Sequence, residues 1–132
     1  MLKLINVGVA SRVGTYSDAA ELPPGARVLL VSGTPGLDGN SGQLPASFEA
    51  QAELAWQNVM RILAAADMGV EHIAKVTHHL VRRQDLAAYR EIRSRHLGAH
   101  QPASMLTFLP ELVWPNMLIE LEVIAAQSPP QA

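Results

Sequence analysis

One stretch near the C-terminal end constrains the fold more than any other part of the chain. Residues Met117–Ala125 are mostly branched apolar residues, which is typical of a β-strand, yet they include Glu120 and Glu122. Side chains alternate across a strand, so both glutamates share one face with Leu118 and Ile124, and the odd-numbered residues form an unbroken apolar face. The apolar face predicts contact with the core. The glutamates therefore point away from it, either onto a solvated face or into a cleft or subunit interface, where a partly buried carboxylate can transfer protons.

The composition fits one domain, expected to span residues 1–126 with a tail at 127–132. The chain has 132 residues, 48% of them hydrophobic, and 10 basic against 12 acidic residues, so no broad basic surface indicates nucleic-acid binding. Cysteine is absent, which excludes disulfides and thiol nucleophiles and fits a reducing compartment. No apolar run is long enough to span a bilayer, and the N-terminus lacks a signal-peptide pattern. We therefore expect a cytoplasmic protein.

The order of expected elements indicates an α+β domain. Strands are expected at residues 2–9, 28–32, 73–81, 104–109 and 117–125, and a loop rich in glycine and proline at 33–45. Ser47 is expected to cap a helix that ends at Gly69, and Asp85 a second helix that ends at Gly98. This order favours a mixed or antiparallel sheet with two helices on one face. The chain has no further element to cover the other face, so we expect self-association.

Short motifs occur along the chain in a specific order. They are V-G-T-Y-S at 13–17, V-S-G-T at 31–34, E-A-Q at 49–51, N-V at 58–59, K-V-T at 75–77, P-A at 102–103 and I-E-L-E-V-I-A at 119–125. Each motif is weak alone, but together, over roughly residues 13–126, they resemble the RidA family, also called the YjgF/L-PSP family. The resemblance implies a chorismate-mutase-like α+β fold and a homotrimer with three clefts between subunits.

The resemblance also implies the site residues and one departure from the family pattern. Tyr16, the backbone at Gly33, and Glu120 correspond to residues that flank the cleft, the glutamate positioning or activating water. Members that hydrolyse 2-aminoacrylate-type imines carry an arginine directly after Pro-Ala, where this chain has Ser104. Serine cannot replace the bidentate grip of a guanidinium on a carboxylate, and loss of such a pair costs about 1.5–3 kcal/mol. We therefore expect Glu120 to be catalytic, Tyr16, Gly33 and Ser104 to bind substrate, and the substrate to differ from 2-aminoacrylate.

Two pairs of basic residues allow alternative interpretations. Arg90 and Arg93 are three apart on the second predicted helix and share a face. Either this face is solvated, or Arg90 supplies the cation that Ser104 does not and joins the substrate-binding residues. His78 and His79 are adjacent on a predicted strand, so they point to opposite faces and cannot chelate a metal together. We expect no metal and no cofactor.

Three functions stay open from the sequence. The first is an enamine or imine deaminase, or a related hydrolase, that acts on a small metabolite in an inter-subunit cleft. The second is a trimer that binds a small metabolite without catalysis. The third is a ribonuclease or translation inhibitor, an activity ascribed to some members of the family. The net charge of −2 and the lack of a basic, aromatic surface disfavour this third function.

Overall fold

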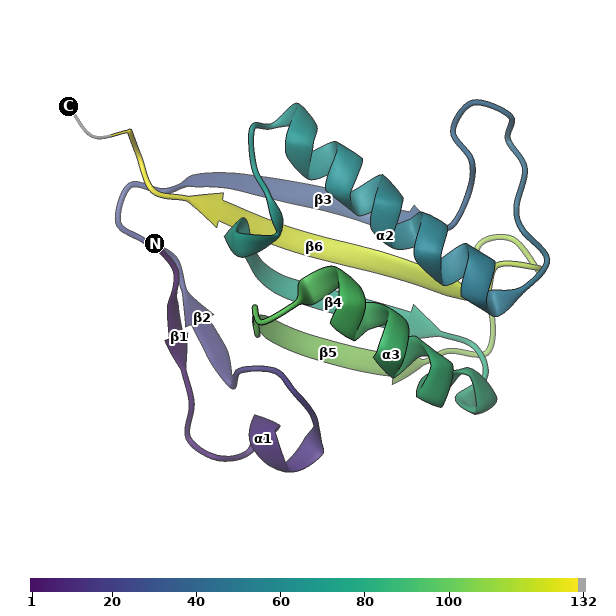
Figure 1. Ribbon diagram of the computed structural model, residues 1–132, viewed down its shortest axis with the longest axis horizontal. Coiled ribbons are helices and arrows are strands. Elements are labelled where there is room, and N and C mark those ends of the chain that lie inside the picture. The colour runs from purple at the N-terminus through teal and green to yellow at the C-terminus, as the bar shows by residue number, and fades with distance from the viewer. Residues whose placement is uncertain (131–132) are drawn as a thin grey trace.

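A four-stranded sheet carries both long helices on one face (Figure 1). The computed structural model describes residues 1–130, and the last two residues of the expected tail lie outside them. The strand order is β3 (Arg27–Pro35), β6 (Ile119–Gln127), β4 (Ile73–Leu80) and β5 (Ala103–Phe108), and the helices are α2 (Phe48–Ala65) and α3 (Leu86–Leu97). β6 is antiparallel to both neighbours, whereas β4 and β5 are parallel. The predicted α+β architecture is therefore confirmed.

The remaining elements are short and lie near the N-terminus or between the longer elements. β1 (Lys3–Ile5) and β2 (Ala19–Glu21) form a two-stranded antiparallel ribbon, with α1 (Ala10–Val13) between them. The 3₁₀ turns η1 (Val70–His72) and η2 (Arg83–Asp85) precede β4 and α3. The expected first strand over residues 2–9 was too long. The Asp18 carboxylate accepts the backbone N–H groups of Val7 and Ala10 at 2.7 and 2.9 Å, which curls this segment away from strand pairing.

The core lies between the helices and the apolar face of the sheet. Four residues of β6 are fully buried there: Ile119, Leu121, Val123 and Ala125. Their partners on α2 include Ala52, Ala55, Trp56, Val59 and Leu63, each also with no exposed surface. Glu120 and Glu122 alternate with the buried positions and lie on the other face of the sheet. The predicted separation of glutamates from core is confirmed.

The helix ends show where local signals decide the structure and where they do not. Ser47 caps α2 as predicted, its hydroxyl accepting the Ala50 N–H at 3.1 Å, and Gly98 ends α3 with φ +59°. α2 ends at Ala65 rather than at Gly69. Asp85 precedes α3, but its side chain does not cap the helix. It binds the Arg82 guanidinium at 2.8 and 2.9 Å, and this bidentate pair occupies both carboxylate oxygens.

β3 extends further than its sequence indicated. The expected strand stopped at residue 32 with a loop from Gly33, whereas β3 continues to Pro35 through a register shift between Val31 and Thr34. A glycine is well suited to such a bulge. Gly33 therefore lies beside β6 rather than in a loop.

Neither long helix covers the second face of the sheet, which we call the bare face (Figure 1). Val28 and Leu30 of β3 and Met105 of β5 are 49%, 74% and 54% exposed there. Val28 and Leu30 are neighbours on this face of edge strand β3, whereas Met105 lies on the opposite edge strand, so the exposed apolar surface is concentrated at β3. The bare face thus agrees with the expected self-association, and the homotrimer stays a prediction.

Candidate functional site

A cavity of about 290 Å³ lies where the N-terminal segment crosses α3 and β5. Its wall includes Tyr16, Arg90, Arg93 and Ser104, together with apolar side chains such as Leu86. The chain therefore brings together three of the residues predicted to bind substrate, Tyr16, Arg90 and Ser104. They come from three separate segments, and Arg93 joins them.

The free edge of β5 positions Tyr16 at this cavity. Buried Ser17 pairs with Ala103 in a parallel bridge, and its N–H donates to the Pro102 carbonyl at 3.1 Å. The Ser17 hydroxyl also donates to the Gln101 carbonyl at 2.6 Å. These bonds hold the N-terminal segment against the edge strand, so Tyr16 lies beside Ser104 in the cavity wall.

Ser104 is the outer member of a chain of side-chain hydrogen bonds. Its hydroxyl lies 2.9 Å from Nε2 of His78, and Nδ1 of His78 bonds the Tyr89 hydroxyl. His78 and Tyr89 are fully buried between the sheet and α3. Burial lowers the pKa of His78 to about 3, with smaller contributions from Arg93 and His79, so the ring is neutral at physiological pH. Burial likewise raises the pKa of Tyr89, which stays protonated.

The two arginines of the cavity differ in environment. Arg90 is exposed, whereas Arg93 is partly buried and lies over the Tyr89 ring, 5.9 Å from its centroid. Burial lowers the pKa of Arg93, although arginine keeps its charge in proteins. Within residues 1–130, Arg93 forms no ion pair, while Arg82 and Arg95 each bind a carboxylate. The sequence placed both arginines on one face but could not show which is desolvated.

Glu120 and Gly33 form a separate cluster on the bare face of the sheet. A Cβ atom on Gly33 would lie 2.8 Å from Cδ of Glu120, so only glycine lets the carboxylate rest against this strand without a shift. Glu120 is half-buried opposite His79, while Glu122 is exposed opposite Thr77. Ser104 lies on the other face, the one covered by the helices, where its hydroxyl bonds His78. Within one chain, Glu120 and Gly33 therefore lie apart from the cavity that Tyr16 and Ser104 line.

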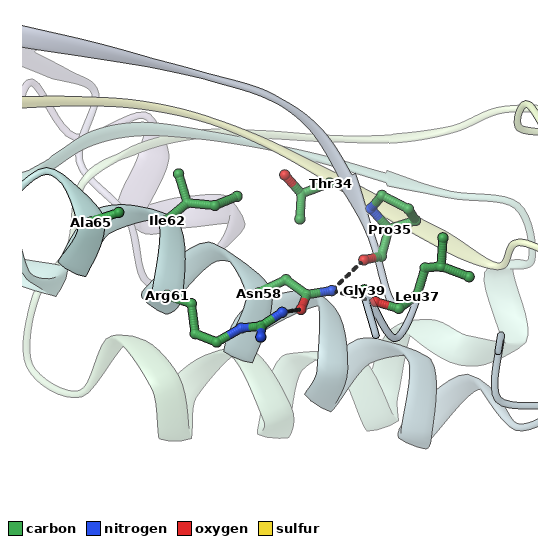
Figure 2. A pocket seen from close by; sticks show the side chains of 8 residues that line it. All are labelled: Thr34, Pro35, Leu37, Gly39, Asn58, Arg61, Ile62 and Ala65. Carbon is green, nitrogen blue, oxygen red and sulfur yellow. Dashed lines mark hydrogen bonds between the residues drawn. The ribbon is translucent and has the colours of Figure 1, made fainter. Parts of the chain in front are cut away.

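A second hollow, of about 400 Å³, lies between α2 and the loop after β3 (Figure 2). Its polar side chains already bond within the chain. The Asn58 amide donates to the carbonyls of Pro35 and Leu37 at 3.1 and 2.9 Å, and Arg61 donates to Asn58 Oδ1 at 2.7 Å (Figure 2). These bonds leave few polar groups for a ligand, and the hollow contains none of the predicted site residues.

Neither a metal site nor a membrane helix occurs in the described part of the chain. No group of three or more histidine, aspartate or glutamate side chains within residues 1–130 is arranged to hold a metal ion. His78 and His79 point to opposite faces, as predicted. No helix among these residues is long and apolar enough to cross a bilayer.

The chain matches a known protein family over nearly its whole length. The profile of the family described as "Endoribonuclease L-PSP" matches residues 9–127. The chain belongs to the RidA (L-PSP) family. The Mus musculus protein named 2-iminobutanoate/2-iminopropanoate deaminase is 31% identical over 121 residues, covering 89% of this chain and 84% of the mouse protein. The Drosophila melanogaster RutC family protein UK114 is 33% identical over 125 residues, covering 93% of this chain and 88% of that relative.

Solved structures of RidA proteins share the fold. A Rid-family protein of unknown function from Yersinia pestis, YyfB, matches with a TM-score of 0.82 and 25% identity, over 96% of this chain and 98% of that one. RidA from the Antarctic bacterium Psychrobacter sp. PAMC 21119 matches with a TM-score of 0.72 and 26% identity, over 92% of each chain. The family identification and the mixed α+β fold predicted from the motifs are both confirmed.

Sequence reasoning missed the hydrogen-bonded chain behind Ser104. Tyr89 and Arg93 are four residues apart, which stacks them on one helix face, and His78 falls on the apolar face of its strand. These spacings were visible in the sequence. The sequence did not show that the strand and the helix meet at Ser104, because this depends on the parallel pairing of β4 with β5.

Proposed function

We propose that this RidA-family chain is an imine or enamine deaminase acting on a small metabolite other than 2-aminoacrylate. The name of the mouse relative supports deamination of small 2-imino acids. The main structural support is the division of the predicted residues into two clusters. Tyr16 and Ser104 line a cavity at the β5 edge, and Gly33 with Glu120 lies on the bare face.

The two clusters become one site if subunits associate through the bare face. In the proposed homotrimer, Glu120 and Gly33 of one subunit complete the cavity formed by Tyr16 and Ser104 of its neighbour. Exposed Val28 and Leu30 beside the Gly33 bulge supply apolar surface for that contact. Each trimer then contains three equivalent clefts.

The proposed reaction is hydrolysis of a C=N bond. Glu120 accepts a proton from water as the water oxygen attacks the imine carbon, and the nitrogen is protonated in turn. The resulting carbinolamine loses ammonia and leaves a carbonyl compound, so one water is consumed for each ammonia released. The Gly33 N–H and the Tyr16 hydroxyl orient the ligand. An enamine enters the same sequence after tautomerising to its imine.

A panel of imines tests this function. Imines are generated in situ from different amino acids by an amino acid oxidase, and 2-aminoacrylate from serine by a dehydratase. The expected result is faster ammonia release than the uncatalysed rate for at least one imine, with little effect on 2-aminoacrylate. Glu120→Gln abolishes the acceleration, whereas the control Glu122→Gln retains it. A rate on 2-aminoacrylate equal to that of an arginine-bearing relative would refute the proposed substrate range.

The alternative is a trimer that binds a metabolite without chemistry. It predicts saturable ligand binding but no accelerated ammonia release from any imine. The exposed position of Arg90 and the apolar side chains in part of the cavity wall are compatible with binding alone. Ribonuclease activity stays the least supported function, despite the family description, because basic residues do not exceed acidic ones. RNA cleavage by highly purified protein, lost in Glu120→Gln, would support it.

A further inference from the structure

Arg93 is a partly desolvated cation with no carboxylate partner in its own chain. It lies in the wall of the 290 Å³ cavity with Tyr16 and Ser104, and its neighbour on the inner side is the Tyr89 ring. Within the described residues its guanidinium has no hydrogen bond to any acceptor that would neutralise it. Removing a charge from water is costly unless an opposite charge compensates. A cation held this way at a cavity wall favours an anionic ligand.

The Ser104 hydroxyl is oriented by the buried residues behind it. Among residues 1–130, the hydrogen-bond partner of the buried Tyr89 hydroxyl is Nδ1 of His78, so Tyr89 donates its proton to this nitrogen. A neutral imidazole carries one proton, which must then be on Nε2 and is donated to Ser104 Oγ at 2.9 Å. The serine oxygen is thereby occupied as an acceptor. Its own proton is free to donate into the cavity.

We propose that Arg93 is the carboxylate anchor of this site and that Ser104 donates the second hydrogen bond to the same carboxylate. This inference rests on the proposed function and specifies its substrate class. An arginine side chain at position 104 would extend from β5 into the cavity, whereas serine leaves that space open. The ligand is therefore a 2-imino or enamino acid with a larger side chain than 2-aminoacrylate has. Arg90, exposed on the same face, is not the anchor.

Binding of stable product analogues tests the anchor without turnover. The probes are 2-oxohexanoate, its uncharged methyl ester and pyruvate, titrated calorimetrically into the assembled protein. Wild-type protein is expected to bind 2-oxohexanoate more tightly than pyruvate or the ester. Arg93→Gln should weaken binding of 2-oxohexanoate by about 10- to 150-fold, as expected for a lost charge-assisted hydrogen bond, and leave the ester unaffected. The affinity of Arg93→Lys for 2-oxohexanoate should fall between the affinities of wild type and Arg93→Gln.

The controls separate anchoring from folding and assembly. Arg95→Gln removes a cation from the opposite face of the same helix, where Arg95 binds Glu53, and should leave binding unchanged. Ser104→Ala should weaken binding of 2-oxohexanoate less than Arg93→Gln does. Unchanged affinity in Arg93→Gln, or no binding of 2-oxohexanoate by wild type, would overturn the inference. Dissociation of the Arg93→Gln oligomer would overturn it too, because Arg93 would then pair with a neighbouring subunit.

Ligand binding tests the role of Arg93 as the anchor, and ammonia release tests the proposed deaminase function, so the two can fail separately. Binding that depends on Arg93, with no accelerated ammonia release from any imine, supports the anchor and refutes catalysis. Accelerated ammonia release that is equal in wild type and Arg93→Gln supports catalysis and refutes the anchor.

Discussion

The buried imidazole of His78 makes a specific prediction about stability in weak acid. Its pKa is about 3 in the folded chain, against about 6.5 in the unfolded chain, because burial penalises the charged ring. The unfolded state therefore binds more protons between these values, and the free energy of unfolding falls as pH falls. The contribution is fully present above about pH 6.5. By proton linkage, His78 alone should lower the free energy of unfolding by about 2 kcal/mol between pH 7 and pH 5.

The carboxylates act in a lower pH range, which separates their contribution from that of His78. Hydrogen bonds from backbone N–H groups lower the pKa of Asp18 and Asp38. Such groups stabilise the fold above their unfolded pKa near 4, and the stability is lost as pH falls through the folded value. The interval from pH 7 to pH 5 therefore lies above the range in which these two carboxylates act.

Urea denaturation at several pH values, at one protomer concentration, measures the effect, because an oligomer's stability depends on concentration. The comparison is wild type against His78→Gln, which retains a donor and an acceptor but does not titrate. Wild type should lose about 2 kcal/mol more than the variant between pH 7 and pH 5. Parallel stability profiles over that interval would show that His78 is not held neutral by the fold.

Four further outcomes are expected. Glu120→Gln should abolish turnover with nearly unchanged melting temperature, and Glu122→Gln should retain it; equal rates would contradict the assignment. Gly33→Ala should lower turnover by about 10-fold or more, because the added methyl displaces the Glu120 carboxyl, while stability to urea changes by less than about 1 kcal/mol. Light scattering at micromolar concentration should give a trimer, and a monomer would exclude the inter-subunit cleft. Arg93→Gln combined with Ser104→Arg should raise deamination of 2-aminoacrylate above wild type, assayed beside an arginine-bearing relative.

Local sequence signals predicted the elements and their faces well. Alternation in β6 placed Glu120 away from the core, and Ser47 and Gly98 marked helix ends, because these features depend on neighbours in sequence. The end of α2 and the extent of β3 were wrong. β3 continues past Gly33 because β6 offers pairing partners beyond the bulge, and such long-range pairing is not encoded in a local window.

The site was predictable only as a set of candidate residues. The motifs named Tyr16, Glu120 and Ser104, but their positions on different faces of the sheet follow from strand pairing. The choice between Arg90 and Arg93 likewise depends on packing, since both occupy one helix face. Burial over the Tyr89 ring distinguishes Arg93, and that contact requires the tertiary structure.

The double variant tests whether positions 93 and 104 work as a pair. With Arg93 retained, an arginine at 104 would bring two like charges into one cavity and would leave His78 Nε2, now bonded to Ser104, without its partner. Ser104→Arg alone should therefore lower the melting temperature and fail to improve turnover of 2-aminoacrylate. Removing Arg93 relieves the repulsion but not the loss of the His78 partner, so the double variant should recover part of the stability and gain that activity. Additive effects of the two substitutions on both measurements would show that the cavity is not built around Arg93 and Ser104 together.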